Sequence, residues 1–374
     1  MKIAIDAAFG KKEPAGLELW GMQFIRHLAE FDRVNEYIIY GYFWRNFHQR
    51  KKMVYVPEEK KISLCVSRIP KQCVDFMESH NIGIIEKLLA GQQIDIFHGI
   101  GFFLPKLKKA KGIITVHGLD FKELEVKWYK DRWYKHFPVY LKRADSIIAV
   151  SEYVKNKLVE LYDIPREKIS VIYHGIRSNF AYPGFDNIEN GVNEKSYIVC
   201  VATSVERKNL KRILKAFNTI KDRHKDVNLL MVGDERMLLS SLKKLIEELD
   251  LSGRIIFPGY LGEDSLPVVY NNAKCLVFPS LYEGLGLPII EAMACGCPVI
   301  TSNITAMPEI AGGAAILVNP YDEDEIADAV DRVLSDERLR QDMKKKGLER
   351  AKFFSWEKAI NNTLDLYNRL SERN

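Results

Sequence analysis

Short apolar runs rich in β-branched residues alternate with longer segments of helical periodicity along most of the chain. In the first half, the pattern predicts strands over 2–7, 37–42, 94–98, 112–117, 146–151 and 169–173. Helical segments such as 17–30 and 152–162 lie between them. Strands that alternate with helices are typical of parallel sheets with right-handed crossovers, so the pattern predicts an α/β fold.

A second series of the same kind follows residues 177–194, which are rich in Gly, Asn and Pro and have the composition of a linker. Its predicted strands are 197–202, 228–232, 255–257, 275–278, 298–301 and 315–317. Its predicted helices are 210–223, 240–249, 265–271 and 287–295, with further helices from 323 to the end. We therefore expect two α/β domains of similar size that join near residue 180. In such sheets ligands bind beyond the carboxyl ends of the strands.

Composition supports this organisation. The chain has 374 residues, of which 47% are hydrophobic and 28% charged, and this excludes a disordered, collagen-like or coiled-coil protein. No run of about 18 uncharged apolar residues occurs, and the first ten residues hold too short an apolar stretch for a signal peptide. The six Cys are scattered. Cys295 and Cys297 form the only close pair, and no second pair or His cluster completes a metal site. We expect unpaired thiols in a reducing compartment.

The charge is distributed unevenly. Residues 1–178 contain 30 Lys and Arg against 21 Asp and Glu, whereas residues 179–374 contain 25 against 29. This asymmetry indicates that the two halves face different partners, or that two solvated surfaces simply differ.

Residues 278–300 form the most informative segment. They read as a strand, a glycine-bearing turn and a helix with Pro288 just inside it, an arrangement that attracts phosphate to the helix N-terminus. The backbone N–H groups at this turn belong to Gly284, Leu285, Gly286 and Leu287. Glu283 precedes the glycines, and Glu291 lies about one turn inside the helix, where a carboxylate suits the vicinal hydroxyls of ribose or a sugar. Spacing alone leaves open a structural turn with a solvated Glu291.

This segment resembles the retaining nucleotide-sugar glycosyltransferases of the GT-B fold, family 4 (glycosyl transferases group 1). Their Glu-x7-Glu hallmark is matched by Glu283 and Glu291, with Glu-Gly-Leu-Gly-Leu-Pro between them and Met-Pro-Glu-Ile at 307–310. The resemblance implies two Rossmann-like α/β/α domains that face a central cleft. It assigns an acceptor domain to 1–178 and a donor domain to 179–357, with a C-terminal helix of about 358–374 packed back onto the first domain.

The resemblance also implies roles for basic residues near the donor. In the family a basic pair after the first strand of the second domain grips the donor diphosphate, and Arg207 and Lys208 match it. Many members carry Gly-Arg where this chain has Ala202-Thr203, so one customary Arg is missing. We expect Lys208 to hold the diphosphate, with Arg207 either assisting or turned to solvent.

Three further residues are carried over by resemblance. His117 ends a strand and matches a family His that contacts the donor sugar near the anomeric centre, although a packed or capping His is the alternative. Gly16 is what remains of consecutive family glycines that let the backbone approach phosphate and acceptor. Tyr260 lies in a loop whose backbone reads the nucleobase. The expected catalytic residues are His117, Lys208 and Glu283, and the others bind the donor.

Asp322-Glu323-Asp324 superficially resembles the Asp-x-Asp metal motif of other glycosyltransferases. The run follows Asn319-Pro320 and opens a helical pattern, so we interpret it as an acidic helix start. The family generally works without a divalent metal. We expect no metal and no cofactor, since the nucleotide-sugar is a substrate.

Residues 127–137 interleave basic and aromatic side chains. Such a surface rests on anionic membranes, where related enzymes meet lipid-linked acceptors, or else it is a core helix with its charges outward. We expect a cytoplasmic protein that works at the inner face of the membrane. No recognition motif for nucleic acid accompanies the charge.

The resemblance implies an enzyme that moves a hexose from GDP-mannose or a UDP-hexose to a glycan or lipid-linked acceptor hydroxyl with retention, in bacterial envelope polysaccharide synthesis. An epimerase or phosphorylase on the same fold fits the Glu-x7-Glu context poorly. The alternative from another class is a degenerate homologue that binds a sugar nucleotide or a partner without transfer. Slow hydrolysis of the donor distinguishes a transferase from a protein that only binds.

Overall fold

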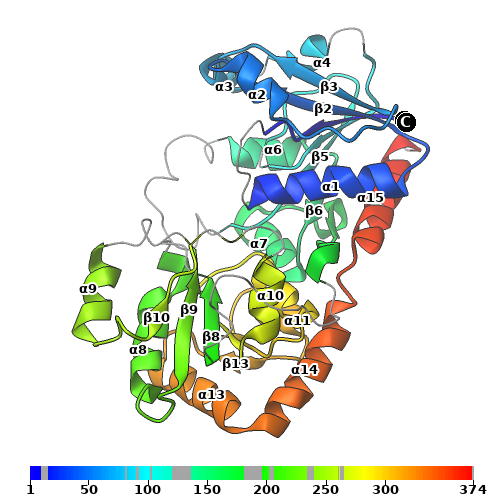
Figure 1. The fold of residues 1–374 in the computed structure, drawn as a ribbon. Coiled ribbons are helices and arrows are strands. Elements are labelled where there is room, and N and C mark those ends of the chain that lie inside the picture. Colours follow the sequence, from blue (N-terminus) through cyan, green and yellow to red (C-terminus); the bar gives the residue numbers. More distant parts are fainter. Residues whose placement is uncertain are drawn as a thin grey trace. The chain divides into compact units, whose positions relative to one another are not determined.

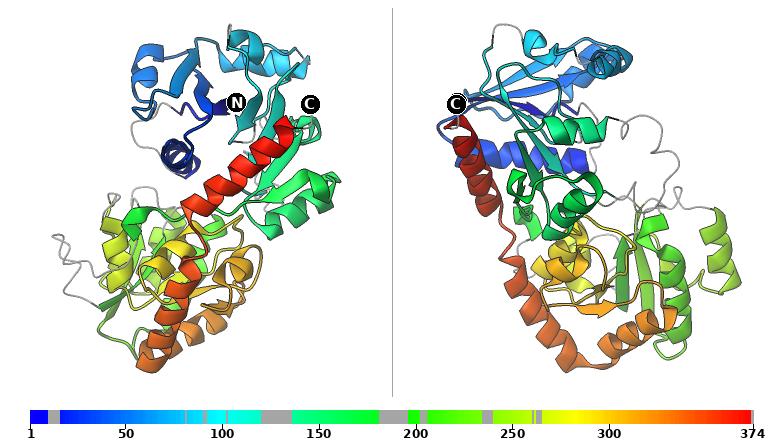
Figure 2. Two further views of the ribbon diagram at one scale, coloured as in Figure 1. Left: turned by 90° about the vertical axis from the view of Figure 1, so that its right-hand side faces the viewer. Right: turned by 180° about the vertical axis from the view of Figure 1, so that it is seen from behind.

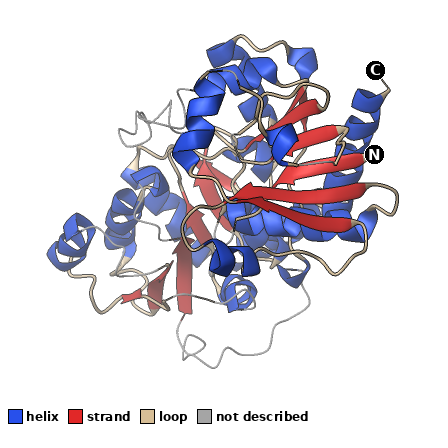
Figure 3. Cartoon of the chain, turned by 90° about the horizontal axis from the view of Figure 1, so that it is seen from above, coloured by secondary structure: helices blue, strands red, loops and turns tan. Residues whose placement is uncertain are grey.

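The computed structural model describes residues 1–9, 16–80, 82–89, 92–101, 103–119, 136–180, 196–201, 206–233, 240–259, 261 and 265–372. The chain divides into two compact units, one formed by Met1–Gly175 with Trp356–Asn374 and the other by Ile176–Ser355. Each unit is an α/β domain built on its own sheet, as the sequence pattern predicts (Figures 1 and 3).

The sheet of the first unit has the strand order β3-β2-β1-β4-β5-β6-β7, and all of these pairings are parallel. Its strands are β1 (Lys2–Asp6), β2 (Glu36–Tyr42), β3 (Ile62–Ser67), β4 (Ile96–Gly99), β5 (Lys111–Val116), β6 (Ser146–Ala149) and β7 (Ile169–Val171). The direction in which the strands are added reverses between β1 and β4. A reversal of this kind opens a crevice at the carboxyl ends of the two strands.

Helices cover this sheet on both faces. They are α1 (Leu17–Phe31), α2 (Phe47–Lys52), α3 (Lys71–Ser79), α4 (Ile85–Leu88), α6 (Phe137–Arg143), α7 (Glu152–Tyr162) and α15 (Trp356–Ser371), with a 3₁₀ turn at Arg166–Lys168. Ile3 and Ile5 of β1 pack with α1 and α15, since alternate residues of a strand share one face. On the other face, Phe97 of β4 contacts Phe103, which in turn contacts Tyr140 of α6.

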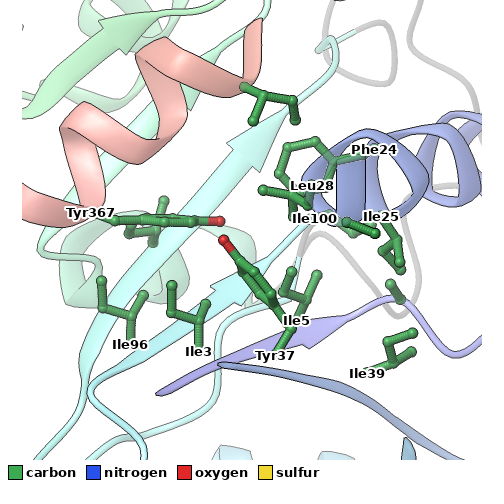
Figure 4. Packing of buried hydrophobic residues seen from close by; sticks show 14 of the residues in the cluster. Ile3, Ile5, Phe24, Ile25, Leu28, Tyr37, Ile39, Ile96, Ile100 and Tyr367 are labelled. Atoms are coloured by element: carbon green, nitrogen blue, oxygen red, sulfur yellow. The ribbon is translucent and has the colours of Figure 1, made fainter. Parts of the chain in front are cut away.

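The C-terminal helix α15 completes the core of the first unit. Trp356, Ile360 and Tyr367 of this helix are buried in the same cluster as α1 and β1. Figure 4 shows the hydroxyl groups of Tyr37 and Tyr367 pointing toward one another within this cluster. In Figure 2, α15 is the red helix that runs to the C-terminal label.

The sheet of the second unit has the order β10-β9-β8-β11-β12-β13 and is also parallel. Its strands are β8 (Ser196–Val201), β9 (Val227–Val232), β10 (Ile255–Ile256), β11 (Leu276–Phe278), β12 (Val299–Ser302) and β13 (Ile316–Val318). Its helices are α8 (Leu210–Ile220), α9 (Ser240–Glu248), α10 (Ser265–Asn272), α11 (Leu287–Ala294), α12 (Met307–Ala311), α13 (Glu323–Ser335) and α14 (Glu337–Ala351), with 3₁₀ turns at Ser178–Phe180 and Glu206–Lys208. Here the order reverses between β8 and β11.

The core of the second unit follows from amphipathic helices. Leu210, Ile213, Leu214 and Phe217 of α8 recur at helical spacing and are buried with α13 against the sheet. Asp322 caps α13 by accepting the N–H groups of Asp324 and Glu325, which confirms the predicted acidic helix start.

The structure also bears on the predicted thiols, strands and membrane segments. All six cysteines are free thiols. The only described strand that the pattern did not predict is β3, which pairs with β2 from Ile62 to Ser67. Within the described ranges, none of the helices has the length and apolar character needed to cross a bilayer.

Candidate functional site

The predicted donor residues of the second unit gather at the carboxyl ends of β8 and β11, the strands on either side of the reversal. Lys208 ends the 3₁₀ turn that follows β8, and Glu283 lies five residues after β11. Chain segments that leave neighbouring parallel strands meet at one edge of the sheet. The fold therefore brings these distant positions together.

A three-charge cluster forms around Glu283. Its Oε1 atom lies 2.8 Å from the Nζ atom of Lys208 and 2.5 Å from the Nη1 atom of Arg207. Glu283 is 9% exposed and Lys208 7% exposed, so this cluster is nearly shielded from water. The Lys208 ammonium also lies 4.4 Å from the centre of the Phe278 ring. Arg207 thus pairs with Glu283, with 25% of its side chain exposed, and its contact with a diphosphate stays a prediction.

The electrostatics of the cluster favour an anionic partner. Burial alone raises the pKa of Glu283, but the positive charges of Lys208 and Arg207 outweigh it and hold the pKa below its usual value. Burial also lowers the pKa of Lys208, and the charge of Glu283 offsets part of this shift. Two cations share one carboxylate, which leaves the cluster with an excess of positive charge.

Hydrogen bonds tie together the loops that carry the cluster. Asn209 adopts a left-handed conformation, with φ of 60°, at the start of α8. Its Nδ2 atom donates to the carbonyl oxygens of Pro279, at 2.9 Å, and Pro320, at 2.6 Å. The N–H group of Leu281 donates to the carbonyl oxygen of Arg207 at 2.7 Å. These bonds fix the segment after β8 against the segment after β11.

The glycine-bearing turn ends at α11, as the sequence predicts. Gly286 precedes the helix with a φ of 92°, a conformation that costs an L side chain free energy, and Pro288 lies in the first turn. Gly284, Leu285 and Gly286 are buried, and Leu287 is the first helical residue. A helix N-terminus directs backbone N–H groups and the positive end of the helix dipole outward, so it can bind a phosphate oxygen.

Glu291 lies on α11 and is not a solvated helix residue. Its Oε1 atom is 3.6 Å from the Nη2 atom of Arg177, with 15% and 12% of the two side chains exposed. The Arg177 guanidinium lies 4.6 Å from the centre of the Phe180 ring. Burial raises the pKa of Glu291, and the charge of Arg177 opposes this shift. The carboxylate is thus held in place by a stacked cation.

His117 belongs to the first unit and directly follows β5. Its Nε2 atom lies 2.8 Å from the carbonyl oxygen of Ile100, and its ring packs edge-on against Trp20 and near His174. Burial lowers the pKa of His117 to about 4, so the imidazole is neutral at pH 7. The residue is packed, and its contact with a sugar stays a prediction.

The remaining predicted residues differ in what the structure says of them. Gly16 precedes α1 with a φ of 56°, and a Cβ atom there would meet nothing within 4 Å. Tyr260 and most of the basic and aromatic segment 127–137 lie outside the described residues. Across the described part of the chain, no group of three or more His, Cys, Asp or Glu side chains is placed to hold a metal ion.

Sequence reasoning missed two residues of the site. Arg177 is the first residue of the linker-like segment 177–194, and no local pattern indicates that it reaches Glu291 on a helix more than a hundred residues later. Thr305 accepts a hydrogen bond from the N–H group of Glu283 at 3.4 Å and has a φ of 59°. Both contacts are long-range, and periodicity reports only on local structure.

Known proteins resemble most of this chain in sequence. Residues 185–350 match the family described as "Glycosyl transferases group 1", and residues 23–180 match "Glycosyltransferase Family 4". The O-antigen chain mannosyltransferase B of Escherichia coli is 30% identical over 284 residues, which cover 73% of this chain and 74% of that protein. The serotype-specific mannosyltransferase WbdA of Escherichia coli is 32% identical over 240 residues, 61% of this chain but 29% of WbdA.

The fold is shared with solved structures. Sucrose-phosphate synthase from Thermosynechococcus elongatus superposes with a TM-score of 0.77 at 20% identity, and the match covers 100% of both chains. Two parallel-sheet domains, this superposition and the family matches establish the GT-B fold. The chain belongs to the group 1 glycosyltransferases.

Proposed function

We propose that this glycosyltransferase moves a hexose, with mannose as the first candidate, from a nucleoside-diphosphate sugar to a hydroxyl group of a glycan or lipid-linked acceptor. The observation that carries the proposal is the pair of buried charge clusters at one sheet edge, Glu283 with Lys208 and Arg207, and Glu291 with Arg177. The first cluster offers cations to a diphosphate. The second offers a carboxylate to ribose hydroxyls.

The proposed chemistry places charge stabilisation in the second unit. Breaking the bond between sugar and diphosphate gives an oxocarbenium-like sugar and a negatively charged leaving group. Lys208, Arg207 and the N–H groups at the start of α11 stabilise that negative charge as it develops. These donors are already positioned and largely shielded from water, so little reorganisation is needed during the reaction.

We further propose that the anomeric configuration is retained and that no metal is required. The cations of Lys208 and Arg207 neutralise the charge of the diphosphate, as a divalent ion does in metal-dependent glycosyltransferases. Since Glu283 is bound to both cations, it serves the sugar hydroxyls and not as a nucleophile of the glycosidase type. The leaving phosphate then takes the proton of the acceptor hydroxyl.

The relatives favour mannose and an envelope polysaccharide. Both Escherichia coli relatives are named as mannosyltransferases, and one is named for the O-antigen chain. This makes GDP-mannose the first donor to test and a UDP-hexose the second. An acceptor carried by a lipid would place the enzyme at the cytoplasmic face of the membrane.

The first experiment is a thermal shift of the purified chain with GDP, UDP, ADP and CMP in the presence of EDTA. A ligand at about 100 times its dissociation constant adds about 2.7 kcal/mol of stability, so the correct base gives a clear shift. The matching sugar nucleotide is then incubated without acceptor, and release of free hexose is followed by NMR.

Two outcomes bear on the rival interpretation of a degenerate binder. One diphosphate that shifts the transition, together with slow release of hexose from its sugar nucleotide, supports the transferase. A nucleotide that binds without any hexose release favours a protein that only binds. Release of the α-anomer from an α-linked donor supports retention, and release of the β-anomer contradicts it.

A further inference from the structure

The first unit contains a cavity that none of the donor residues of the second unit lines. Its volume is 930 Å³, near the upper end of the range of about 300–1,000 Å³ that is typical of ligand pockets. Asp6 at the end of β1, Tyr42 at the end of β2 and Gly101 after β4 all line it. It therefore opens at the carboxyl ends of the strands around the β1–β4 reversal, where α/β sheets bind ligands.

The Asp6 carboxylate lies at the wall of this cavity. In the described residues no hydrogen bond or ion pair reaches it, and burial raises its pKa to about 7 with no counter-charge to oppose the shift. Asp6 is only partly buried, so its carboxylate is accessible from the cavity. A ligand that enters the cavity can therefore donate hydrogen bonds to this carboxylate.

Aromatic side chains surround this carboxylate. The cavity is lined by Phe9, Tyr42, Phe43, Trp44 and Phe103. Trp44 is 53% exposed, which is unusual for so large an apolar side chain in the absence of a partner. Flat apolar rings beside a hydrogen-bond acceptor suit a ligand with both apolar C–H faces and hydroxyl groups.

The wall of the cavity carries charges of both signs, from Asp6, Glu18, Arg45 and Arg50. Arg50 also lines the cavity, but its Nη2 atom donates to the carbonyl oxygen of Phe9 at 3.2 Å and its guanidinium lies 4.0 Å from the centre of the Phe43 ring. Glu18 adds a second carboxylate to the lining. The Asp6 carboxylate can accept hydrogen bonds from two neighbouring hydroxyls.

We propose that this cavity binds the terminal sugar of the acceptor, that Asp6 accepts hydrogen bonds from two adjacent hydroxyls of that sugar, and that Trp44 packs against its ring. The inference rests on the proposed function, because a transfer reaction needs a site for its second substrate. It assigns a chemical class to that substrate: a hexopyranoside end with a free vicinal hydroxyl pair.

The test uses p-nitrophenyl glycosides of α-mannose, α-glucose, α-galactose and β-N-acetylglucosamine as probes. Binding is measured by saturation-transfer difference NMR on the wild type, Asp6→Asn, Trp44→Ala and Glu36→Gln. Glu36 begins β2 at the opposite end of the same sheet, so Glu36→Gln is the matched control for removal of a carboxylate. Asn has nearly the shape of Asp, and Trp44 is exposed, so both variants should fold.

We expect at least one glycoside to bind, with a dissociation constant that rises at least tenfold in Asp6→Asn and in Trp44→Ala and is unchanged in Glu36→Gln. The inference is overturned if none of the four glycosides binds the wild type, or if Asp6→Asn binds as the wild type does. Full retention of binding in Trp44→Ala overturns the role assigned to Trp44.

A separate measurement keeps this inference distinct from the proposed function. Hydrolysis of the sugar nucleotide without acceptor is followed in the same variants, and Asp6→Asn should retain it within about twofold. Loss of glycoside binding with retained hydrolysis supports the acceptor site. A wild type that binds glycosides but never hydrolyses a donor contradicts the proposed function alone. If the wild type hydrolyses the donor and Asp6→Asn binds glycosides as the wild type does, the acceptor site alone is contradicted.

Discussion

The ammonium group of Lys208 lies 2.8 Å from the Oε1 atom of Glu283, and both side chains are almost completely buried. Removing one partner of a buried pair leaves an uncompensated charge, which costs about 3–5 kcal/mol where no other partner exists. Arg207 remains beside Glu283, so Lys208→Ala should lower the free energy of unfolding by about 2 kcal/mol. Donor hydrolysis should fall about 100-fold or more, since a transition-state donor is lost.

Urea unfolding and donor hydrolysis measure the two effects. Lys215→Ala is the matched control, because Lys215 forms an ion pair with Glu323 in which more than a third of each side chain is exposed. We expect it to change stability by less than about 1 kcal/mol and to leave hydrolysis unchanged. Equal effects of the two substitutions would contradict the role given to the buried pair.

Glu291→Gln should weaken binding of the nucleoside diphosphate about tenfold, or about 1.4 kcal/mol. The amide keeps the shape but replaces two charge-assisted hydrogen bonds to the ribose hydroxyls with neutral ones. Calorimetric titration measures the affinity, and the 2′,3′-dideoxy form of the same diphosphate is the control. If Glu291 contacts ribose, the wild type and the variant bind the dideoxy form equally. An equal loss with both ligands points to a different role.

Stability should decline as the pH falls below about 6.5. Burial lowers the pKa of His98 to about 3 and that of His117 to about 4, so between these values and 6.5 the unfolded chain binds protons that the folded chain does not. Each such group steepens the decline by up to about 1.4 kcal/mol per pH unit. The free energy of unfolding, measured in urea from pH 8 to 5, reports this slope.

The contribution of one histidine can be isolated. His98 lies 2.6 Å from the Tyr367 hydroxyl and 2.7 Å from Thr115 Oγ1, and His98→Gln removes its titration from the folded and unfolded states alike. The stability difference between wild type and variant should therefore shrink as the pH falls from 7 to 5. His48→Gln, at an exposed position, should leave the difference constant. If the difference in free energy of unfolding between wild type and His98→Gln does not change with pH, the burial of His98 is not linked to its protonation.

Gly175→Ala should destabilise the first unit by about 3 kcal/mol. A Cβ atom at this position would lie 2.3 Å from the backbone nitrogen of Trp356 and 2.4 Å from the Cγ atom of its ring, so backbone has to move. Gly253→Ala is the control, because nothing lies within 4 Å of a Cβ atom there. Thermal and urea unfolding compare the two variants. Equal stability would mean that the contact with Trp356 relaxes at little cost.

The sequence predicts those features that depend on local pattern. The turn at Gly286 and the start of α11 follow from a strand, a glycine and a proline in order. The strand β3 has the alternating apolar residues Ile62, Leu64 and Val66. It lies at the edge of the sheet with one neighbouring strand, and its pattern is short and flanked by charged segments, so the sequence does not predict it. Pairing with β2 is a tertiary interaction, which periodicity cannot report.

The same limit applies to the candidate site. Glu283 and Glu291 belong to one continuous motif, so a sequence resemblance finds them together. Arg177 reaches Glu291 only because the fold brings the start of the second unit to α11, and Thr305 meets Glu283 through the loop after β12. Lys208 is predicted as a diphosphate ligand, whereas its ion pair with Glu283 follows from the adjacency of β8 and β11 in the sheet.

The position of α15 has a consequence for biosynthesis. Its residues from Trp356 onward complete the core of the first unit, whereas the second unit is a single uninterrupted stretch of chain. During translation, Ile176–Ser355 is synthesised before α15, the helix that completes the first unit. The apolar surface of α1 and β1 therefore lacks its final layer until Trp356–Ser371 has been synthesised. A nascent chain that stops before Trp356 would expose that surface to chaperones and proteases.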